Sequence, residues 1–102
     1  MSASDFPSGV ELEDVYLVEA MYLPGAAERR ATVRGPHLSR IAELKAAGTI
    51  IEAGAFRDVS SSILIVRAED EAAAVAIAQA DVYVTAGVWG EITARLFGRV
   101  KT

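Results

Sequence analysis

One histidine and its arginine neighbours are the residues of this chain best suited to proton-transfer chemistry. His37 is the only histidine, and Arg34 and Arg40 lie three residues before and after it. Histidine is the side chain whose unperturbed pKa lies nearest neutral pH, so a proton donor or acceptor is expected here. A nearby guanidinium could bind a substrate carboxylate or stabilise an oxyanion. The alternative is a structural histidine that bonds the backbone and packs on a sheet.

A carboxylate partner would strengthen the catalytic interpretation, because it fixes the tautomer of the imidazole. Asp81 is the best candidate, since it follows the second expected helix and both helices are expected on one face of a sheet. Its alternative role is to cap the short turn that follows. Asp58 and Asp70 are weaker candidates, in a surface loop and at a helix start. Tyr83, two residues after Asp81, is a candidate to line a binding pocket.

Other kinds of site find no support in the sequence. The chain has no cysteine, and one histidine among scattered acids does not give metal-ligand spacing, so we expect neither a metal nor a cofactor. No glycine pattern follows a strand in the way that a phosphate-binding loop requires. The net charge of −4 and the lack of a long apolar run argue against nucleic-acid binding and a membrane span. The absence of cysteines and of targeting signals favours the cytoplasm.

The elements that must position these residues follow from the apolar pattern. Strands are expected at residues 14–22, 49–56, 62–68 and 91–100, and a helix at residues 72–80. A helical segment at 26–33 is expected to stop at Gly35 and Pro36, where a new helix begins that ends before Gly48. The order β-α-β-β-α-β is that of a ferredoxin-like α+β domain, with both helices on one face of an antiparallel sheet.

The length and the strand pattern lead to expectations about domains and assembly. At 102 residues the chain has room for one domain, expected at residues 13–102 after a flexible tail of residues 1–12. Apolar side chains occupy both faces of the strands; in the first strand Val15 points to one side and Val18 to the other. Because two helices cover only one face, a second copy of the chain is the expected cover of the other. We therefore expect a homodimer joined through the open face of the sheet.

Several short motifs along the chain together resemble a known family. They are Arg34, His37 and Leu38 in an R-x-x-H-L pattern, Gly48, Ala53-Gly54 in the second strand, and Asp81. In this order they are similar to the YCII-related (YciI-like) family, of the dimeric ferredoxin-like α/β-barrel type. The resemblance implies a homodimer with sheets packed face to face and a pocket with a histidine–aspartate pair, here His37 and Asp81 with Arg34 nearby. Where the family often has Asp-Pro before an aromatic residue, this chain has Val82.

Two kinds of function remain open from the sequence. The first is a small-molecule enzyme of lyase or isomerase type that needs no metal. In it His37 acts as general base or acid, Asp81 orients it, and Arg34 and Tyr83 bind the substrate. Relatives of similar architecture, which include muconolactone isomerase and dehydrochlorinase-type enzymes, are consistent with this class. The second is a non-catalytic module that binds a small, anionic molecule in the same pocket or serves only the dimer.

Overall fold

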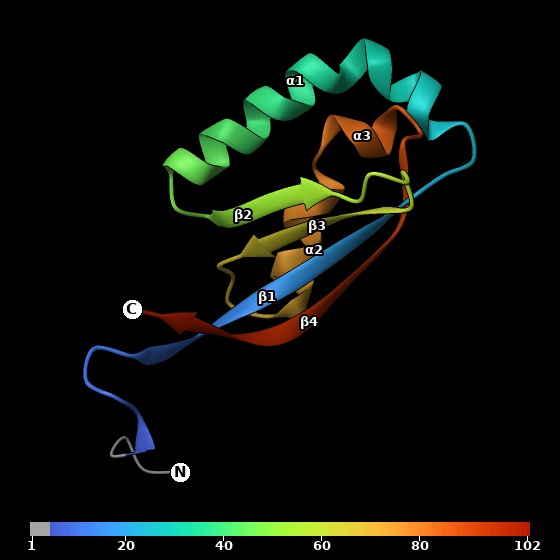
Figure 1. Cartoon of the computed structure of the whole chain (residues 1–102). Coiled ribbons are helices and arrows are strands. Elements are labelled where there is room, and N and C mark those ends of the chain that lie inside the picture. Colours follow the sequence, from blue (N-terminus) through green and yellow to red (C-terminus); the bar gives the residue numbers. More distant parts are fainter. Residues whose placement is uncertain (1–4) are drawn as a thin grey trace.

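The computed structural model describes residues 5–102, which form one sheet with helices on one face (Figure 1). The elements of this part are β1 Glu11–Tyr22, α1 Ala26–Ala46, β2 Ile50–Ala55, β3 Ser61–Val66, α2 Glu71–Gln79, α3 Val82–Thr85 and β4 Trp89–Lys101. The strand order is β2-β3-β1-β4, and each neighbouring pair is antiparallel. This is the ferredoxin-like α+β fold that the sequence predicts. The predicted flexibility of residues 1–4 lies outside the described residues.

The first helix is a single element, and the expected interruption at Gly35 and Pro36 is wrong. α1 runs through Pro36 without a break. The proline ring has no N–H to donate to the carbonyl one turn earlier, which costs the helix one hydrogen bond. The buried side chains of Ala26, His37 and Ile41 nevertheless hold both halves against the rest of the molecule. Tertiary packing therefore overrides the local break, and His37 lies within a long helix rather than at a helix start.

The first and last strands of the chain, β1 and β4, are longer than the apolar pattern indicates. β1 begins at Glu11, inside the segment expected to be a flexible tail, and β4 begins at Trp89. The two strands pair from Glu11 opposite Lys101 to Tyr22 opposite Trp89. Each strand satisfies the backbone N–H and C=O groups of the other, so pairing continues where the side chains are no longer apolar.

The hydrophobic core lies between the sheet and the helices. Val18, Leu64 and Val66 are almost completely buried on the helix face of the strands. α2 packs on β1 and β4, whereas α1 lies over β2 and contacts α3. α1 is therefore carried at one edge of the sheet (Figure 1). No helix within residues 5–102 has the length and apolar character needed to cross a bilayer.

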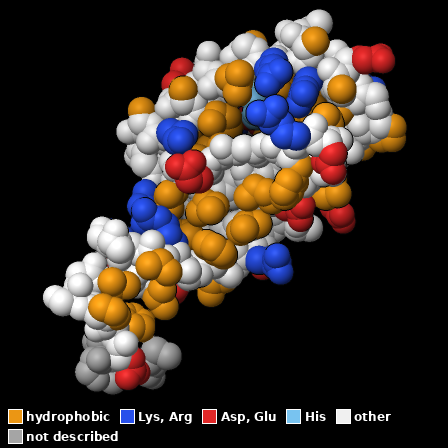
Figure 2. Space-filling view, in the orientation of Figure 1, with side chains coloured by type: hydrophobic (Ala, Val, Ile, Leu, Met, Phe, Trp, Pro, Cys, Tyr) orange, Lys and Arg blue, Asp and Glu red, His pale blue; other side chains and the backbone are white. Residues whose placement is uncertain are grey.

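The opposite face of the sheet carries apolar side chains that no helix covers. Leu17 pairs with Ile65 in neighbouring strands and points away from the helices, as does Ile63. Met21 is 40% exposed and Phe97 is 39% exposed. Figure 2 shows hydrophobic side chains gathered over the strands on this face. The sheet thus has apolar residues on both sides, as the alternation in the sequence indicates.

Candidate active site

His37 and Asp81, which are 44 residues apart in the chain, lie in hydrogen-bond contact. Nδ1 of His37 is 2.8 Å from Oδ1 of Asp81. Both side chains are buried, with 8% of His37 and 1% of Asp81 exposed to solvent. α1 carries the imidazole, and the residue immediately before α3 carries the carboxylate. The fold therefore brings together the two residues that the sequence proposes as a pair.

The Asp81 carboxylate has three partners, which fix its orientation. Oδ1 also accepts a hydrogen bond from the backbone N–H of Tyr83 at 2.9 Å, so Asp81 is the N-cap of α3. Oδ2 accepts from Arg40 at 3.1 Å, and the same guanidinium donates to the carbonyl of Ile77 at 2.8 Å. The two roles that the sequence left as alternatives are filled by one carboxylate. The cap orients the carboxylate even though Val82 stands where the family often has proline.

The charge state of Asp81 determines which nitrogen of the histidine is free. Burial by itself would raise the pKa of this carboxyl. The hydrogen bonds from His37, from the Tyr83 N–H and from Arg40 outweigh burial, and the pKa lies below its usual value. An ionised carboxylate can only accept, so the neutral imidazole carries its proton on Nδ1. Nε2 is then left with a lone pair, and His37 lines a cavity.

Two aromatic side chains hold the imidazole in place. The rings of His37 and Tyr83 are stacked, with 3.7 Å between centroids and an angle of 9° between planes. Trp89 meets each of these rings edge-on, at 5.3 Å in both cases. Because Asp81 bonds one ring edge and Tyr83 covers one ring face, rotation of the imidazole would break both contacts. Tyr83, the expected pocket residue, lies beside the histidine.

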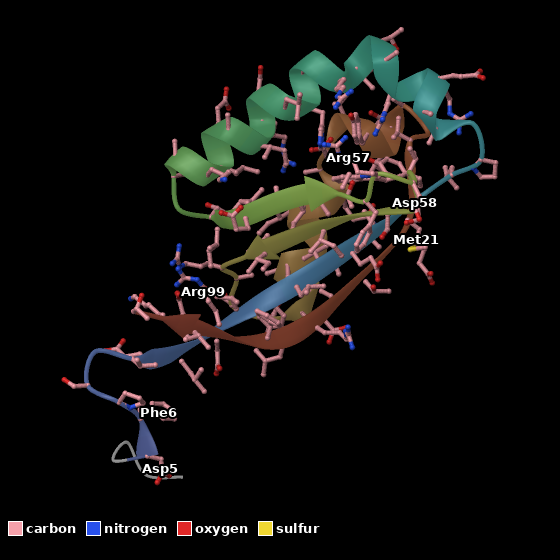
Figure 3. The ribbon with its side chains drawn as sticks, in the orientation of Figure 1. Asp5, Phe6, Met21, Arg57, Asp58 and Arg99 are labelled. Carbon is pink, nitrogen blue, oxygen red and sulfur yellow. The ribbon has the colours of Figure 1, made fainter. Side chains whose placement is uncertain are left out.

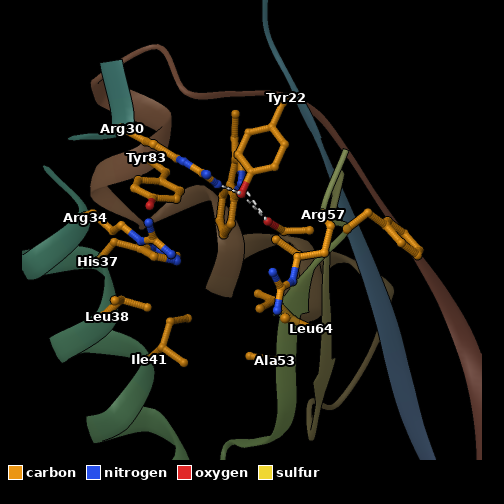
Figure 4. Close-up of a pocket in the computed structure, with 15 residues that line it drawn as sticks. Tyr22, Arg30, Arg34, His37, Leu38, Ile41, Ala53, Arg57, Leu64 and Tyr83 are labelled. Carbon is orange, nitrogen blue, oxygen red and sulfur yellow. Dashed lines mark hydrogen bonds between the residues drawn. The ribbon is translucent and has the colours of Figure 1, made fainter. Parts of the chain in front are cut away.

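A cavity of about 310 Å³ opens beside His37 (Figure 4). Its walls come from α1, α3 and the four strands, with the link between β2 and β3. The residues that line it are Tyr22, Arg30, Arg34, His37, Leu38, Ile41, Ala53, Gly54, Ala55, Phe56, Arg57, Ser62, Leu64, Tyr83 and Trp89. This volume is at the small end of the range for small-molecule sites.

The cavity is positively charged although the chain is acidic. Three arginines line it, Arg30 and Arg34 from α1 and Arg57 from the link between β2 and β3, while no aspartate or glutamate does. None of the three takes part in the ion pairs found within residues 5–102. Figure 2 shows Lys and Arg side chains gathered beside α1, and Figure 3 places Arg57 at the same end of the sheet as Met21. The cavity therefore favours an anionic ligand.

Sequence reasoning missed two of these arginines. Arg30 lies four residues before Arg34 and therefore on the same side of a continuous α1. The expected break at Pro36 hid this relation. No sequence pattern indicates that Arg57 lines the cavity, because a residue in a hairpin link reaches it only through the pairing of β2 with β3.

The sequence also missed a chain of hydrogen bonds in the cavity wall. Nε1 of Trp89 donates to Oγ of Ser62 at 3.3 Å, and this hydroxyl lies 3.0 Å from the hydroxyl of Tyr22. Ser62 belongs to a run of three serines that is typical of a turn. Here it lies within β3 and is 4% exposed. Its role depends on which face of the strand it occupies.

The weaker aspartate candidates make local contacts elsewhere. Asp58 accepts from the N–H and the hydroxyl of Ser60, which closes the link between β2 and β3. Asp70 accepts from the N–H of Ala73 and caps α2. Within residues 5–102, no group of three histidine or acidic side chains is placed to hold a metal ion.

Comparisons with known proteins agree with the fold. The profile of the YCII-related domain matches residues 15–97. A protein of Haemophilus influenzae, described as uncharacterised, is 32% identical over 95 residues that cover 83% of this chain and 97% of that protein. Among solved structures, a 5-chloro-2-hydroxyhydroquinone dehydrochlorinase from Burkholderia phenoliruptrix, in complex with 2,5-dihydroxybenzoquinone, superposes with a TM-score of 0.67 at 22% identity. That match covers 79% of this chain and 90% of the other, and it shows a shared fold.

Proposed function

Because this chain belongs to the YCII-related domain family, we propose that it is a small-molecule enzyme of lyase or isomerase type that works by proton transfer. The observation that carries the proposal is the 2.8 Å contact between His37 and Asp81 at the wall of a cavity. A paired imidazole beside a space for a ligand is the arrangement that general acid–base catalysis requires. The fold neighbour named as a dehydrochlorinase supports the lyase class.

In the proposed reaction His37 is the base. Nε2 takes a proton from the substrate, and the electron pair of the broken bond remains on the substrate. In a lyase this pair forms a double bond as a leaving group departs with its own bonding pair. In an isomerase His37 returns the proton at another atom. The ionised Asp81 stabilises the imidazolium that forms, and Arg40 holds the carboxylate in place.

The arginines of the cavity would act on the charge of the substrate. Arg34 lies one turn before His37 on α1 and lines the same space. A guanidinium there can bind a carboxylate or stabilise an oxygen on which negative charge develops. The Tyr83 ring would form part of the wall against which the substrate packs, since it lines the cavity as well as covering the imidazole.

Replacement of the base is the direct test of this proposal. We would follow chloride release from 5-chloro-2-hydroxyhydroquinone, the compound in the name of the fold neighbour, and proton exchange into hydroxylated aromatic acids in D₂O by NMR. His37→Gln is expected to remove at least about 100-fold of any activity that wild type shows. Glu43→Gln, exposed on the same helix and outside the cavity lining, is the matched control and should remain active. Full activity of folded His37→Gln would contradict the proposal.

A non-catalytic binding module is the alternative. The three arginines that line the cavity favour an anionic ligand for such a module. It differs in the consequence of changing Asp81. If the protein is a binding module, Asp81→Asn should leave its affinity for ligand unchanged. Wild type should then show no turnover. The enzyme should lose turnover in the same variant. Ligand binding by calorimetry, measured beside NMR detection of turnover, separates the two functions.

We also propose that the protein is a homodimer through the open face of the sheet. Leu17, Ile63, Ile65, Met21 and Phe97 supply an apolar surface there. Burying a large aliphatic side chain contributes about 1.5–3 kcal/mol, so covering several of them is a substantial gain for a domain of this size. A second copy presents the same surface and can pack on it by two-fold symmetry.

A further inference from the structure

The hydrogen-bond chain from Trp89 to Tyr22 has a direction. The indole N–H of Trp89 can only donate, so the Oγ atom of Ser62 must accept it. Ser62 has one proton of its own, which it donates to the hydroxyl oxygen of Tyr22 at 3.0 Å. Tyr22 is thus the acceptor of this bond. The hydroxyl proton of Tyr22 takes no part in these hydrogen bonds.

Arg30 donates a second hydrogen bond to the hydroxyl oxygen of Tyr22. Its NH1 atom lies 3.5 Å from the Tyr22 hydroxyl, and its guanidinium carbon is 5.8 Å from the centre of the Tyr22 ring. The oxygen therefore accepts from Ser62 and from a cation, while the hydrogen bonds found within residues 5–102 show no protein acceptor for its proton. A hydroxyl that accepts hydrogen bonds becomes a stronger donor through polarisation.

Tyr22 lines the cavity, so its hydroxyl proton lies at the cavity wall. Tyr22, Ser62, Trp89 and Arg30 all line it together with His37. Figure 4 shows the Tyr22 hydroxyl and its hydrogen bond with Arg30 on the side of the cavity away from Leu38 and Ile41. No aspartate or glutamate lines this space, so no carboxylate of the cavity wall competes with a ligand for this proton.

We infer that Tyr22 is a further ligand-binding residue, whose hydroxyl donates a hydrogen bond to an oxyanion of a planar ligand, with Ser62 and Trp89 as its positioning residues. The inference rests on the proposed function for the identity of this site. Aromatic walls from Tyr83 and Trp89 suit a flat ligand, and Arg30 balances its charge. The ligand class is a phenolate, or an enolate formed when His37 removes a proton from a carbon next to a carbonyl.

A pair of simple probes tests the inference without turnover. 4-Nitrophenolate carries the oxyanion, and 4-nitroanisole is the methyl ether of the same ring, which cannot ionise. Both dissociation constants would be measured by calorimetry at one mildly alkaline pH. Trp89, the only tryptophan, provides a fluorescence check that the probe is in this cavity. Wild type is expected to prefer 4-nitrophenolate.

The variants separate a hydroxyl donor from a merely structural tyrosine. Tyr22→Phe should lower the affinity for 4-nitrophenolate about tenfold or more and leave the affinity for 4-nitroanisole within about twofold, which is the loss of one hydrogen bond to a charged group. Tyr16→Phe, on the same strand but outside the cavity lining, should change neither affinity. Equal losses for both probes, or no loss for 4-nitrophenolate, would overturn the inference.

The serines supply a matched pair for the positioning role. Ser61 and Ser62 are adjacent and buried, but Ser61 donates to Glu19 instead of Tyr22. Ser62→Ala should reduce the preference for 4-nitrophenolate about threefold, and Ser61→Ala should leave it unchanged. His37→Gln should keep the preference, which separates this inference from the proposed proton transfer. Loss of the preference in His37→Gln would assign the oxyanion to the histidine and overturn the inference.

Discussion

The imidazole of His37 is stacked on the ring of Tyr83, with 3.7 Å between the ring centroids. Asp81, two residues before Tyr83, bonds the edge of the same imidazole. The four-residue helix α3 and its cap thus supply two of the contacts that hold the candidate base, beside the edge-on contact from Trp89. So short a helix has little stability of its own, which makes the geometry of the site depend on the burial of Tyr83.

Truncation of Tyr83 should therefore damage both the fold and the site. Tyr83→Ala removes a side chain that is 2% exposed, and we expect a loss of about 3–5 kcal/mol in the free energy of unfolding. Tyr83→Phe keeps the stacked ring and should stay within about 1 kcal/mol of wild type. Urea unfolding of the three proteins tests this. A Tyr83→Ala variant as stable as Tyr83→Phe would show that the ring does not support the site.

Replacement of Asp81 by asparagine should abolish turnover while the protein remains folded. The amide cannot stabilise an imidazolium, and it presents a neutral group to Arg40. We expect activity to fall at least about 100-fold and stability by about 1–3 kcal/mol. Asp70→Asn is the matched control, since Asp70 is also an N-cap and asparagine caps a helix equally well. Equal effects of the two substitutions would reduce Asp81 to a cap.

The pKa of Asp81 predicts how stability depends on pH. Because this pKa is lowered in the folded protein, the carboxylate stabilises the fold at pH values above its ordinary value of 3.8. That contribution is lost as the pH falls through the lower, folded-state value. The stability difference between wild type and Asp81→Asn should be largest near neutral pH and shrink in acid. Urea unfolding at pH 7 and pH 3 measures it, and a difference independent of pH would contradict the assignment.

Gly35 offers a test of the continuous helix α1. It lies in the helix, is exposed, and a Cβ atom added there would meet nothing within 4 Å apart from its chain neighbours and the helix's own backbone. Gly35→Ala should stabilise the protein by less than the gain of about 0.5–1 kcal/mol at an ordinary helix site, because the Cβ of a residue before proline crowds the proline ring when that residue is helical. Gly48→Ala is the opposite case, since Gly48 follows the helix at φ 81°. It should cost about 1–2 kcal/mol, and thermal unfolding compares the two.

The open face of the sheet predicts the mass of the protein in solution. Wild type should sediment as a dimer at micromolar concentration. Ile65→Lys places a charge on the open face and should yield monomer or aggregate. Leu64→Lys is less informative, because Leu64 is 2% exposed within the core of one chain and its change should unfold the monomer. A well-folded wild-type monomer at this concentration would refute the dimer.

Local patterns determined much of this protein. Alternation and turn residues predict the four strands, and the acids before residues 72–80 predict α2 close to its observed bounds. The two-sided apolar pattern of β1 and β3 is visible in the sequence, since side chains of a strand alternate with a fixed period. A lone histidine also stands out by its chemistry. These features depend on residues near each other in the chain, so the sequence alone reveals them.

Tertiary structure decided the rest. Local rules end a helix at Gly35-Pro36, but packing of the segments on either side keeps α1 whole and brings Arg30 to the cavity. Tyr22, Ser62 and Trp89 meet only because β1, β3 and β4 lie in the observed order and register. Which face a strand residue occupies, and what lies across the cavity from it, depends on pairing between distant segments. Local sequence patterns do not specify those pairings, because each requires the whole sheet to form.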